Sequence, residues 1–258
     1  MAVAGVPDYR VDEFGERGHD LALVIPVLNE NGRIRRQLAQ IQQCAPQVDV
    51  VIADGGSTDG SVDPVALEGL GVRTLLTKTG PGKLSAQLRM AFHYCLEQGY
   101  DGVITMDGNA KDGAEGIAVI AAALEQGFDF VQGSRFVPGG VAQNTPRSRY
   151  VAIRTVHAPV TSAAARTWYT DTTNGFRGHS RRLLSDPRVA PLRDVFDTYE
   201  LLAYLPIRAS RLGLRVTEVP ARRTYPASEP TPTKITGWSG NTELLRILAR
   251  AAAGRYNP

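Results

Sequence analysis

The fold is decided by the stretch VITMDGNAKD, residues Val103–Asp112. Its first four residues are largely apolar and β-branched, a composition typical of a buried strand. An acidic, glycine-containing turn with Asp107 and Asn109 follows, and an alanine-rich helical pattern then covers Asp112–Gln126. In open α/β sheets, the carboxyl ends of buried parallel strands line the crevice that binds ligands. The stretch therefore predicts an α/β protein with Asp107 in a ligand crevice.

Asp107 and Asn109 place two oxygen ligands within one turn. Oxygen ligands suit Mg²⁺ or Mn²⁺, and proteins usually share these ions with substrate phosphates. A second interpretation is that Asp107 only caps the helix that follows. These residues alone support both interpretations equally.

Strand, turn and helix patterns alternate through the first half of the chain. The expected strands are Leu21–Ile25, Val48–Ala53, Val72–Leu76, Val103–Met106 and Phe128–Gln132, and the main expected helices are 29–43, 84–98 and 112–126. Such alternation with short connections predicts a mostly parallel α/β sheet covered by helices on both faces. Asp54 and Asp107 each follow a strand, so we expect both at the same edge of the sheet.

The second half of the chain is less regular. We expect a loop at 133–147, helices at 150–167, 199–212 and 241–253, a polar turn with a short strand at 171–178, an edge-type strand at 214–219, and a proline-rich segment at 222–234. Residues 1–20 are charged and contain several glycines, which predicts an N-terminal tail or an edge segment. No repeat or linker divides the remainder, so we expect a single domain over residues 21–258.

Composition narrows the class of protein. Arginine supplies 25 of the 29 basic residues, and its planar guanidinium group suits phosphate. These residues are dispersed without an aromatic-interleaved patch, so no nucleic-acid partner is expected. Cys44 and Cys95 lie in expected helices without a partner motif, which is typical of reduced thiols in a cytoplasmic protein. No signal peptide is visible, and no apolar run approaches the roughly 20 residues of a membrane-spanning helix.

Eight short motifs occur in order along the chain. They are IPVLNE (25–30), DGGSTDG (54–60), GK (82–83), MDGN (106–109), GSRF (133–136), TNGFR (173–177), YELL (199–202) and LGLRVTEVP (212–220). Together they resemble family 2 glycosyltransferases of the GT-A (Rossmann-like) fold, and the nearest branch is similar to dolichyl-phosphate mannose synthases and other polyprenyl-phosphate glycosyltransferases. The resemblance covers about residues 21–234. It implies a nucleotide-sugar half over 21–132 and an acceptor half over 133–258.

The resemblance implies a nucleotide site in the first half. Pro26, Asn29 and Glu30 match the family's first nucleotide-contacting turn, and Asp54 matches the acid that contacts the base. Lys83 opens a helix, where a phosphate contact is expected. Structural interpretations stay open: a strand stop and helix cap at the first turn, a turn former at Asp54, and a solvated lysine at Lys83.

The resemblance also implies a metal site. Asp107 matches the first acid of the family's metal-binding triplet, so Asp107 and Asn109 are the expected ligands of Mg²⁺ or Mn²⁺. Asn109 stands where a second acid is usual, and Lys111 stands where close relatives often have a further polar metal contact. A neutral amide compensates less charge than a carboxylate, and Lys111 would bring positive charge near the diphosphate itself. We therefore expect a modest metal affinity.

Four basic residues match family positions that bind phosphates or the acceptor. They are Arg135, Arg149, Arg177 and Lys234. The residues that flank Arg135 and Arg177 match best. A phosphate acceptor is already ionised and needs no base, whereas a hydroxyl acceptor needs a positioned base. Asp171 and Glu200 are the candidate bases, and a structural hydrogen-bonding role is the other interpretation of both.

The motifs favour an inverting transfer of a sugar from a nucleoside-diphosphate sugar to a polyprenyl phosphate. Asp107 and Arg177 would then be catalytic, with Asp171 or Glu200 acting if the acceptor is a hydroxyl. The alternatives are a family 2 transferase that glycosylates a sugar or small-molecule hydroxyl, and a nucleotidyltransferase or non-catalytic nucleotide-sugar-binding subunit. We expect a cytoplasmic protein. The basic face of the last helix leaves open a peripheral contact with anionic lipid at the inner face of the membrane, and a homo-oligomer is also left open.

Overall fold

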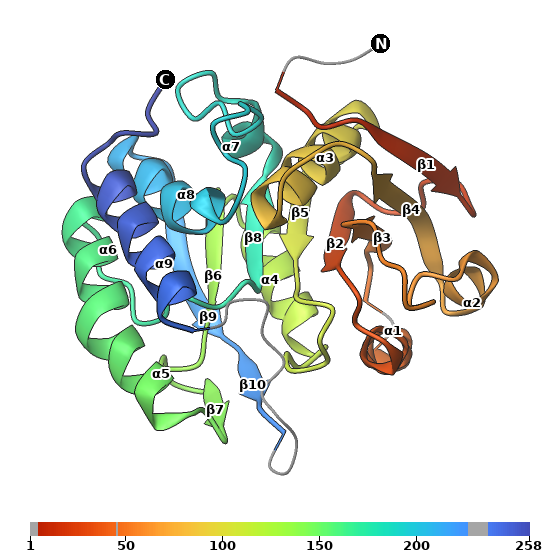
Figure 1. Ribbon diagram of the computed structural model, residues 1–258, viewed down its shortest axis with the longest axis horizontal. Coiled ribbons are helices and arrows are strands. Elements are labelled where there is room, and N and C mark those ends of the chain that lie inside the picture. Colours follow the sequence, from red (N-terminus) through yellow and green to blue (C-terminus); the bar gives the residue numbers. More distant parts are fainter. Residues whose placement is uncertain (1–4, 45, 227–236) are drawn as a thin grey trace.

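The computed structural model describes residues 5–44, 46–226 and 237–258 (Figure 1). The strands are β1 (Tyr9–Glu13), β2 (Leu21–Val27), β3 (Asp49–Asp54), β4 (Val72–Lys78), β5 (Gly102–Thr105), β6 (Phe130–Ser134), β7 (Val141–Gln143), β8 (Arg177–Ser180), β9 (Val216–Pro220) and β10 (Arg222–Thr224). The helices are α1 (Gly32–Cys44), α2 (Pro64–Gly69), α3 (Leu84–Glu97), α4 (Gly116–Glu125), α5 (Arg147–Ala152), the π-helical turn η1 (Ile153–His157), α6 (Ala158–Ala165), α7 (Arg181–Ser185), α8 (Glu200–Arg211) and α9 (Gly237–Ala252).

Eight strands form one sheet in the order β1-β4-β3-β2-β5-β8-β6-β9 (Figure 1). Strands β4, β3, β2 and β5 run parallel, so their carboxyl ends meet at one edge of the sheet. Strand β8 runs antiparallel between β5 and β6, and β9 is parallel to β6. Strands β7 and β10 pair in parallel as a small second sheet. The predicted mostly parallel sheet is confirmed.

The core lies on both faces of this sheet. Along β2, Ala22 and Val24 belong to one cluster of buried apolar residues, whereas Leu23 and Ile25 belong to the other, because successive side chains of a strand point to opposite faces. Buried residues of α3, α8 and α9 complete the first cluster, and those of α1 and α4 complete the second. Helices therefore cover both faces, as predicted.

The N-terminal segment is part of the sheet. Residues Tyr9–Glu13 form β1, which pairs antiparallel with β4 and covers its outer edge. Side chains at both ends of β1 hold it against α3: the Tyr9 hydroxyl lies 3.2 Å from His93 Nδ1, and the Tyr94 hydroxyl donates to Glu13 over 2.5 Å. Of the two expectations for this segment, the edge segment is therefore confirmed for Tyr9–Glu13, which form an edge strand and not a tail.

The helix expected at 150–167 is interrupted. It consists of α5, the π-helical turn η1 and α6, and it ends where Arg166 adopts a left-handed conformation with φ 57°. Pro159 has no amide hydrogen for the carbonyl four residues earlier, which favours a break in the α-helical pattern at this point.

Short strands occur where a loop and a proline-rich segment were expected. Strand β7 lies within the predicted loop 133–147, and β10 lies at the start of the predicted segment 222–234. Residues 227–234 of that segment, including Lys234, lie outside the described residues.

The last helix, α9, packs on α8 and α6 (Figure 1). Its side chains Ile247, Leu248 and Ala251 are buried, while Leu245 is 44% exposed. The buried stripe thus docks the helix on the domain. None of the described helices is long and apolar enough to cross a membrane.

Candidate active site

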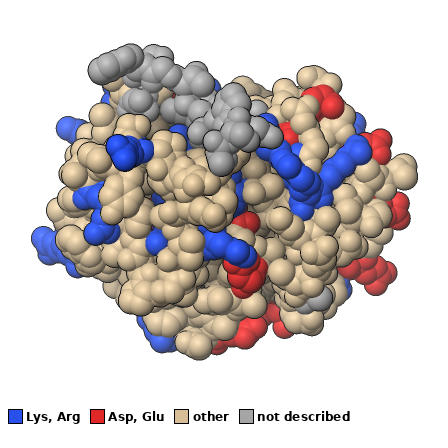
Figure 2. Space-filling model, turned by 90° about the horizontal axis from the view of Figure 1, so that it is seen from below, with Lys and Arg blue, Asp and Glu red and all other residues tan. Residues whose placement is uncertain are grey.

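The candidate site lies where the carboxyl ends of β2, β3 and β5 meet. The register pairs Val27 with Asp54 and Val24 with Thr105, which brings the turns after all three strands to one edge. Lys and Arg side chains are visible on this face of the molecule (Figure 2). From α3, the Gln87 amide donates to the backbone oxygens of Val27 and Ala53 over 2.9 and 2.8 Å. Gln87 therefore holds the two strand ends together, a role that no motif in the sequence indicated.

The turns after β2 and β3 are joined by hydrogen bonds. The Ser57 hydroxyl accepts from the Asn29 amide over 2.9 Å, and the Thr58 amide donates to Asn29 Oδ1 over 2.8 Å. Asn29 has φ 49°, a conformation that asparagine tolerates better than most residues. Pro26 lies in β2, and Glu30 forms an ion pair with Arg33 over 3.1 Å.

Asp54 is buried beneath this pair of turns. Its carboxylate accepts from the amides of Gly56 and Ser57 and, over 2.6 Å, from the Ser57 hydroxyl. Both oxygens are thus used within the turn, an arrangement that agrees with the turn-former interpretation of Asp54. Lys83 is exposed at the start of α3, one helical turn before Gln87.

The turn after β5 carries a buried charge cluster. Arg223, from β10, donates to Asp107 Oδ2 over 2.7 Å and to Asp112 Oδ2 over 2.5 Å. The Asn174 side-chain oxygen accepts from the same guanidinium over 3.0 Å. Burial would raise the pKa of Asp107, but Arg223 and Lys111 outweigh it and hold that pKa below its usual value. Burial and Arg223 together lower the pKa of Lys111 to about 8.

The donor set at Asp107 does not fit a divalent cation. Its Oδ2 oxygen accepts from Arg223 and, over 3.3 Å, from the Asn109 amide nitrogen. The Oδ1 oxygen lies against the Gly175 backbone, since a Cβ atom built there would come within 2.7 Å of it. The Asn109 oxygen accepts from the Lys111 amide over 3.3 Å. Among the described residues, no group of three His, Cys, Asp or Glu side chains is placed to hold a metal ion.

Arg135 and Asp171 form a buried, two-pronged ion pair. Arg135 Nε and Nη2 donate to the two Asp171 oxygens over 2.6 and 2.8 Å, and Nη2 also donates to the Thr173 hydroxyl over 3.0 Å. Burial alone would raise the pKa of Asp171, but Arg135 holds it below its usual value. Asp171 is therefore unsuited to act as a general base. Arg135 Nη1 is buried and has no hydrogen-bond partner within the described part of the chain.

Arg177 is a structural residue of the core. Its guanidinium donates to the backbone oxygens of Asn174, Leu202 and Thr172 over 3.0, 2.8 and 2.8 Å. The side chain is 1% exposed, and burial lowers its pKa to about 10. The expectation that Arg177 binds the acceptor phosphate does not fit this arrangement, because its donors are taken up by the backbone of the turn and of α8.

Glu200 also has a structural position. Its carboxylate accepts from the amide and the hydroxyl of Thr198, both over 2.7 Å, at the start of α8. Its proposed role as a base therefore has no support in the geometry.

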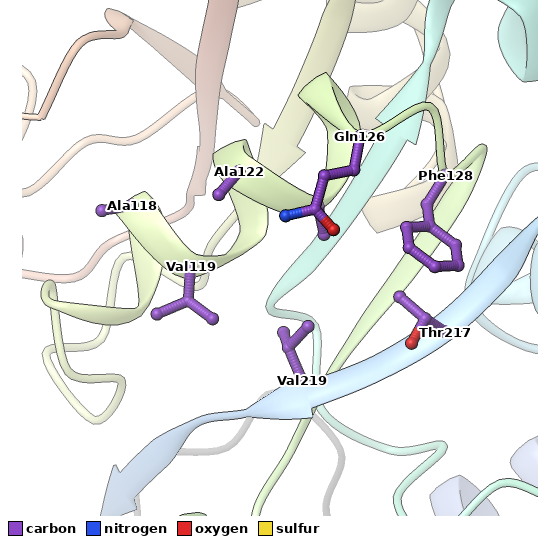
Figure 3. A pocket seen from close by; sticks show the side chains of 8 residues that line it. Ala118, Val119, Ala122, Gln126, Phe128, Thr217 and Val219 are labelled. Carbon is purple, nitrogen blue, oxygen red and sulfur yellow. The ribbon is translucent and has the colours of Figure 1, made fainter.

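A separate hollow of about 510 Å³ between α4 and β9 is lined by apolar and neutral side chains, Phe128 and Val219 among them (Figure 3). It contains none of the charged residues above.

Tyr225 brings the remaining basic residues together. Its hydroxyl accepts from Arg149 Nη1 over 3.1 Å, and Lys111 Nζ lies 5.1 Å from the centre of its ring. Burial would raise its pKa, but Arg223 and Arg149 outweigh this and lower the pKa of Tyr225 to about 8. The sequence offered no signal for Tyr225, because nothing in the residues around it distinguishes it from an ordinary packing tyrosine.

Comparison with known proteins assigns the chain to a family. Residues 22–186 match the model of Glycosyl transferase family 2. The chain belongs to this family. It is therefore a glycosyltransferase, as the ordered motifs predicted.

Two relatives of this glycosyltransferase lie in the polyprenyl-phosphate branch. The polyprenol monophosphomannose synthase of Mycolicibacterium smegmatis is 25% identical over 238 residues, 91% of this chain and 88% of that protein. The undecaprenyl-phosphate mannosyltransferase of Micrococcus luteus is 28% identical over 242 residues, 90% of this chain and 94% of that protein. These matches confirm the branch that the sequence resembles.

A solved structure confirms the GT-A fold. Glucosyl-3-phosphoglycerate synthase from Mycobacterium tuberculosis, in complex with Mn²⁺, UDP-glucose and phosphoglyceric acid, aligns with a TM-score of 0.65 at 18% identity. The alignment covers 92% of this chain and 80% of that one. That neighbour binds Mn²⁺ together with the nucleotide sugar.

Proposed function

We propose that this enzyme transfers a sugar, with inversion, from a nucleoside-diphosphate sugar to a polyprenyl phosphate. The observation that carries the proposal is the Arg135–Asp171 ion pair, because it removes a candidate base for a hydroxyl acceptor. An ionised phosphate oxygen attacks without a base, so the engagement of Asp171 by Arg135 does not count against this acceptor. The two relatives, a polyprenol monophosphomannose synthase and an undecaprenyl-phosphate mannosyltransferase, support the same acceptor class.

In this proposal the two halves of the chain have different tasks. The half 21–132 binds the nucleotide sugar, through the joined turns after β2 and β3 and through Lys83 at the start of α3. The half 133–258 binds the acceptor phosphate. Arg135 offers Nη1, which has no partner within the described residues, and Arg149 lies beside Tyr225 at the edge of the same cluster. A guanidinium group suits this task because it stays charged and its fork can meet two phosphate oxygens, as Arg149 could, whereas Arg135 has Nη1 alone to offer.

The acceptor sets where the enzyme works. A polyprenyl chain keeps its phosphate at a membrane surface, so we place the enzyme at the cytoplasmic face of the membrane, in peripheral contact with it. Helix α5 carries Tyr150 and Val151, which are 46% and 54% exposed, beside the basic residues Arg147 and Arg154. This mixture of apolar and basic side chains is suited to an anionic lipid surface.

The decisive assay compares acceptors. The purified enzyme is given a panel of nucleoside-diphosphate sugars with a short-chain polyprenyl phosphate, the matching free alcohol, or simple sugars. We expect a glycosylated product and release of nucleoside diphosphate with the phosphate alone. Transfer to the alcohol or to a sugar, and never to the phosphate, would overturn the proposal, and release of pyrophosphate would indicate a nucleotidyltransferase.

A substitution of Arg149 tests the proposed contact with the acceptor phosphate. Arg149→Gln should lower the rate of transfer to the polyprenyl phosphate at least about tenfold, which corresponds to roughly 1.4 kcal/mol of transition-state stabilisation. Nucleotide binding should be unchanged, since Arg149 is not among the proposed nucleotide contacts. Arg188→Gln, at an exposed arginine outside α5 that pairs with Asp186, is the control and should retain activity. Equal rates in both variants would remove Arg149 from the acceptor site.

A further inference from the structure

We propose that Arg223, with Lys111 beside it, takes the place of a divalent metal ion in this enzyme and stabilises the leaving diphosphate. The inference rests on the proposed function, because it concerns the departure of a nucleoside diphosphate. In that step the bond between the anomeric carbon and the diphosphate oxygen breaks, and its electron pair leaves on the diphosphate. An acceptor oxygen forms the new bond to the same carbon. Positive charge is needed where the electron pair arrives.

Arg223 occupies the cation position on Asp107. Its Nη2 lies 2.7 Å from Asp107 Oδ2, the distance of a short charge-assisted hydrogen bond. A dication on the same oxygen would meet the guanidinium at close range, and the resulting repulsion opposes binding. The second oxygen lies against the Gly175 backbone, which crowds that side of the carboxylate.

The backbone holds Arg223 in this place. Strand β10 pairs with β7, Arg223 bridges to Asp112, and the Thr224 amide donates to the Lys111 oxygen over 2.8 Å. The guanidinium then bonds to both Asp107 and Asp112, and the side chain is 6% exposed. A metal ion could displace it only by breaking these contacts together. Arg223 is therefore a built-in part of the turn after β5.

The local charges match those of a metal site. A dication on two carboxylates sums to zero, and so do the two cations Arg223 and Lys111 with the two carboxylates Asp107 and Asp112. Asn109 fits the same scheme, because a third carboxylate would leave the cluster negative before the diphosphate arrives. The departure from the family pattern at residue 109 and the presence of Arg223 thus have one explanation. Lys111 extends the positive charge toward Tyr225, over whose ring its ammonium lies.

Direct measurement of Mn²⁺ binding tests the inference without any substrate. The purified full-length chain is stripped with chelator, and Mn²⁺ binding is followed by electron paramagnetic resonance, with and without nucleoside diphosphates. We expect no stoichiometric Mn²⁺ site at millimolar metal in either case. A stoichiometric site that disappears in Asp107→Asn would overturn the inference and leave the proposed function standing.

Nucleotide binding and the rate of sugar transfer provide a second test of the inference. Calorimetric affinities for nucleoside diphosphates, and the rate of sugar transfer, should change less than twofold between excess chelator and added Mn²⁺. Lys111→Gln should weaken nucleotide binding at least about tenfold, and Mn²⁺ should not restore it. Recovery of lost activity by Mn²⁺ in the wild type would overturn the inference. If neither condition gives nucleotide binding or transfer, the proposed function fails, and the inference fails with it.

The preceding residue, Arg222, provides a matched control for Arg223. Arg222 pairs with Glu115 at the surface, where both side chains are 53% exposed. Arg222→Gln should behave as the wild type, whereas Arg223→Gln should lose at least about tenfold in transfer rate. The double variant Arg223→Gln with Asn109→Asp should gain a Mn²⁺ signal, because the guanidinium is removed and a second carboxylate is added. Its absence in a variant that folds, as judged by circular dichroism, would count against the inference.

Discussion

Among single residues, arginines of the same chemistry have very different tasks in this enzyme. Arg177 gives its donors to three backbone oxygens, Arg135 gives two nitrogens to Asp171, and Arg223 bridges two carboxylates. The difference comes from the acceptors that each one meets. Flanking residues alone therefore did not separate a structural arginine from a phosphate ligand.

Gly175 offers a test at the scale of one residue. A Cβ atom at this position would lie 2.7 Å from Asp107 Oδ1, so Gly175→Ala must push the carboxylate away from its place. We expect the rate of sugar transfer to fall at least about tenfold, while the protein remains folded. Gly32→Ala is the control, because nothing lies within 4 Å of its added methyl group. Full activity of Gly175→Ala would show that the position of Asp107 is not critical.

Among the secondary-structure elements, β8 connects the two halves of the site. It is inserted between β5 and β6, so the turn before it, with Asn174 and Gly175, lies beside Asp107. Within β8, His179 is buried against the rings of Phe92 and Phe130 at 5.2 and 5.5 Å. A buried imidazole in such surroundings stays neutral.

His179 should make the stability of the enzyme depend on pH. Burial and the nearby Arg177 lower the pKa of His179 from 6.5 to about 3. Below pH 6.5 the unfolded chain therefore binds a proton that the folded chain does not, so folded stability is complete above pH 6.5 and falls as the pH drops. The loss is about 1.4 kcal/mol per pH unit at most. In urea unfolding between pH 7 and pH 4, His179→Phe should show a flatter pH dependence than the wild type, and an identical slope would contradict this account.

In the whole molecule, the last helix closes the core beside the acceptor half. Leu248 of α9 is 5% exposed, and the neighbouring Ile247 and Ala251 belong to the buried cluster that includes α3 and α8, whereas Leu245 is 44% exposed. Leu248→Ala should lower the free energy of unfolding by about 2–4 kcal/mol, because it leaves a cavity. Leu245→Ala should change it by less than about 0.5 kcal/mol. Denaturant unfolding of both variants checks this, and equal effects would mean that α9 is not docked in this register.

Local patterns along the chain were enough to predict the class of fold, the positions along the chain of the first strands with their crevice turns, and the family. These features are local: alternating patterns mark strands and helices, and Asp107 follows its strand within two residues. Turn chemistry and motif order follow the chain, so they can be recognised without knowing which segments meet. The expected nucleotide turns with Asn29 and Asp54 lie together because β2 and β3 are parallel neighbours in the sheet.

The bonding partners of the charged groups in the crevice became visible only in the folded chain. Arg223 and Asp107 are separated by 116 residues, and Arg135 and Asp171 by 36. No local pattern records such pairs, because a guanidinium takes whichever acceptors the folded chain brings within about 3 Å. The antiparallel insertion of β8 and the pairing of β10 create these distances. They pair Asp171 with Arg135 and Asp107 with Arg223, two contacts that the sequence did not indicate.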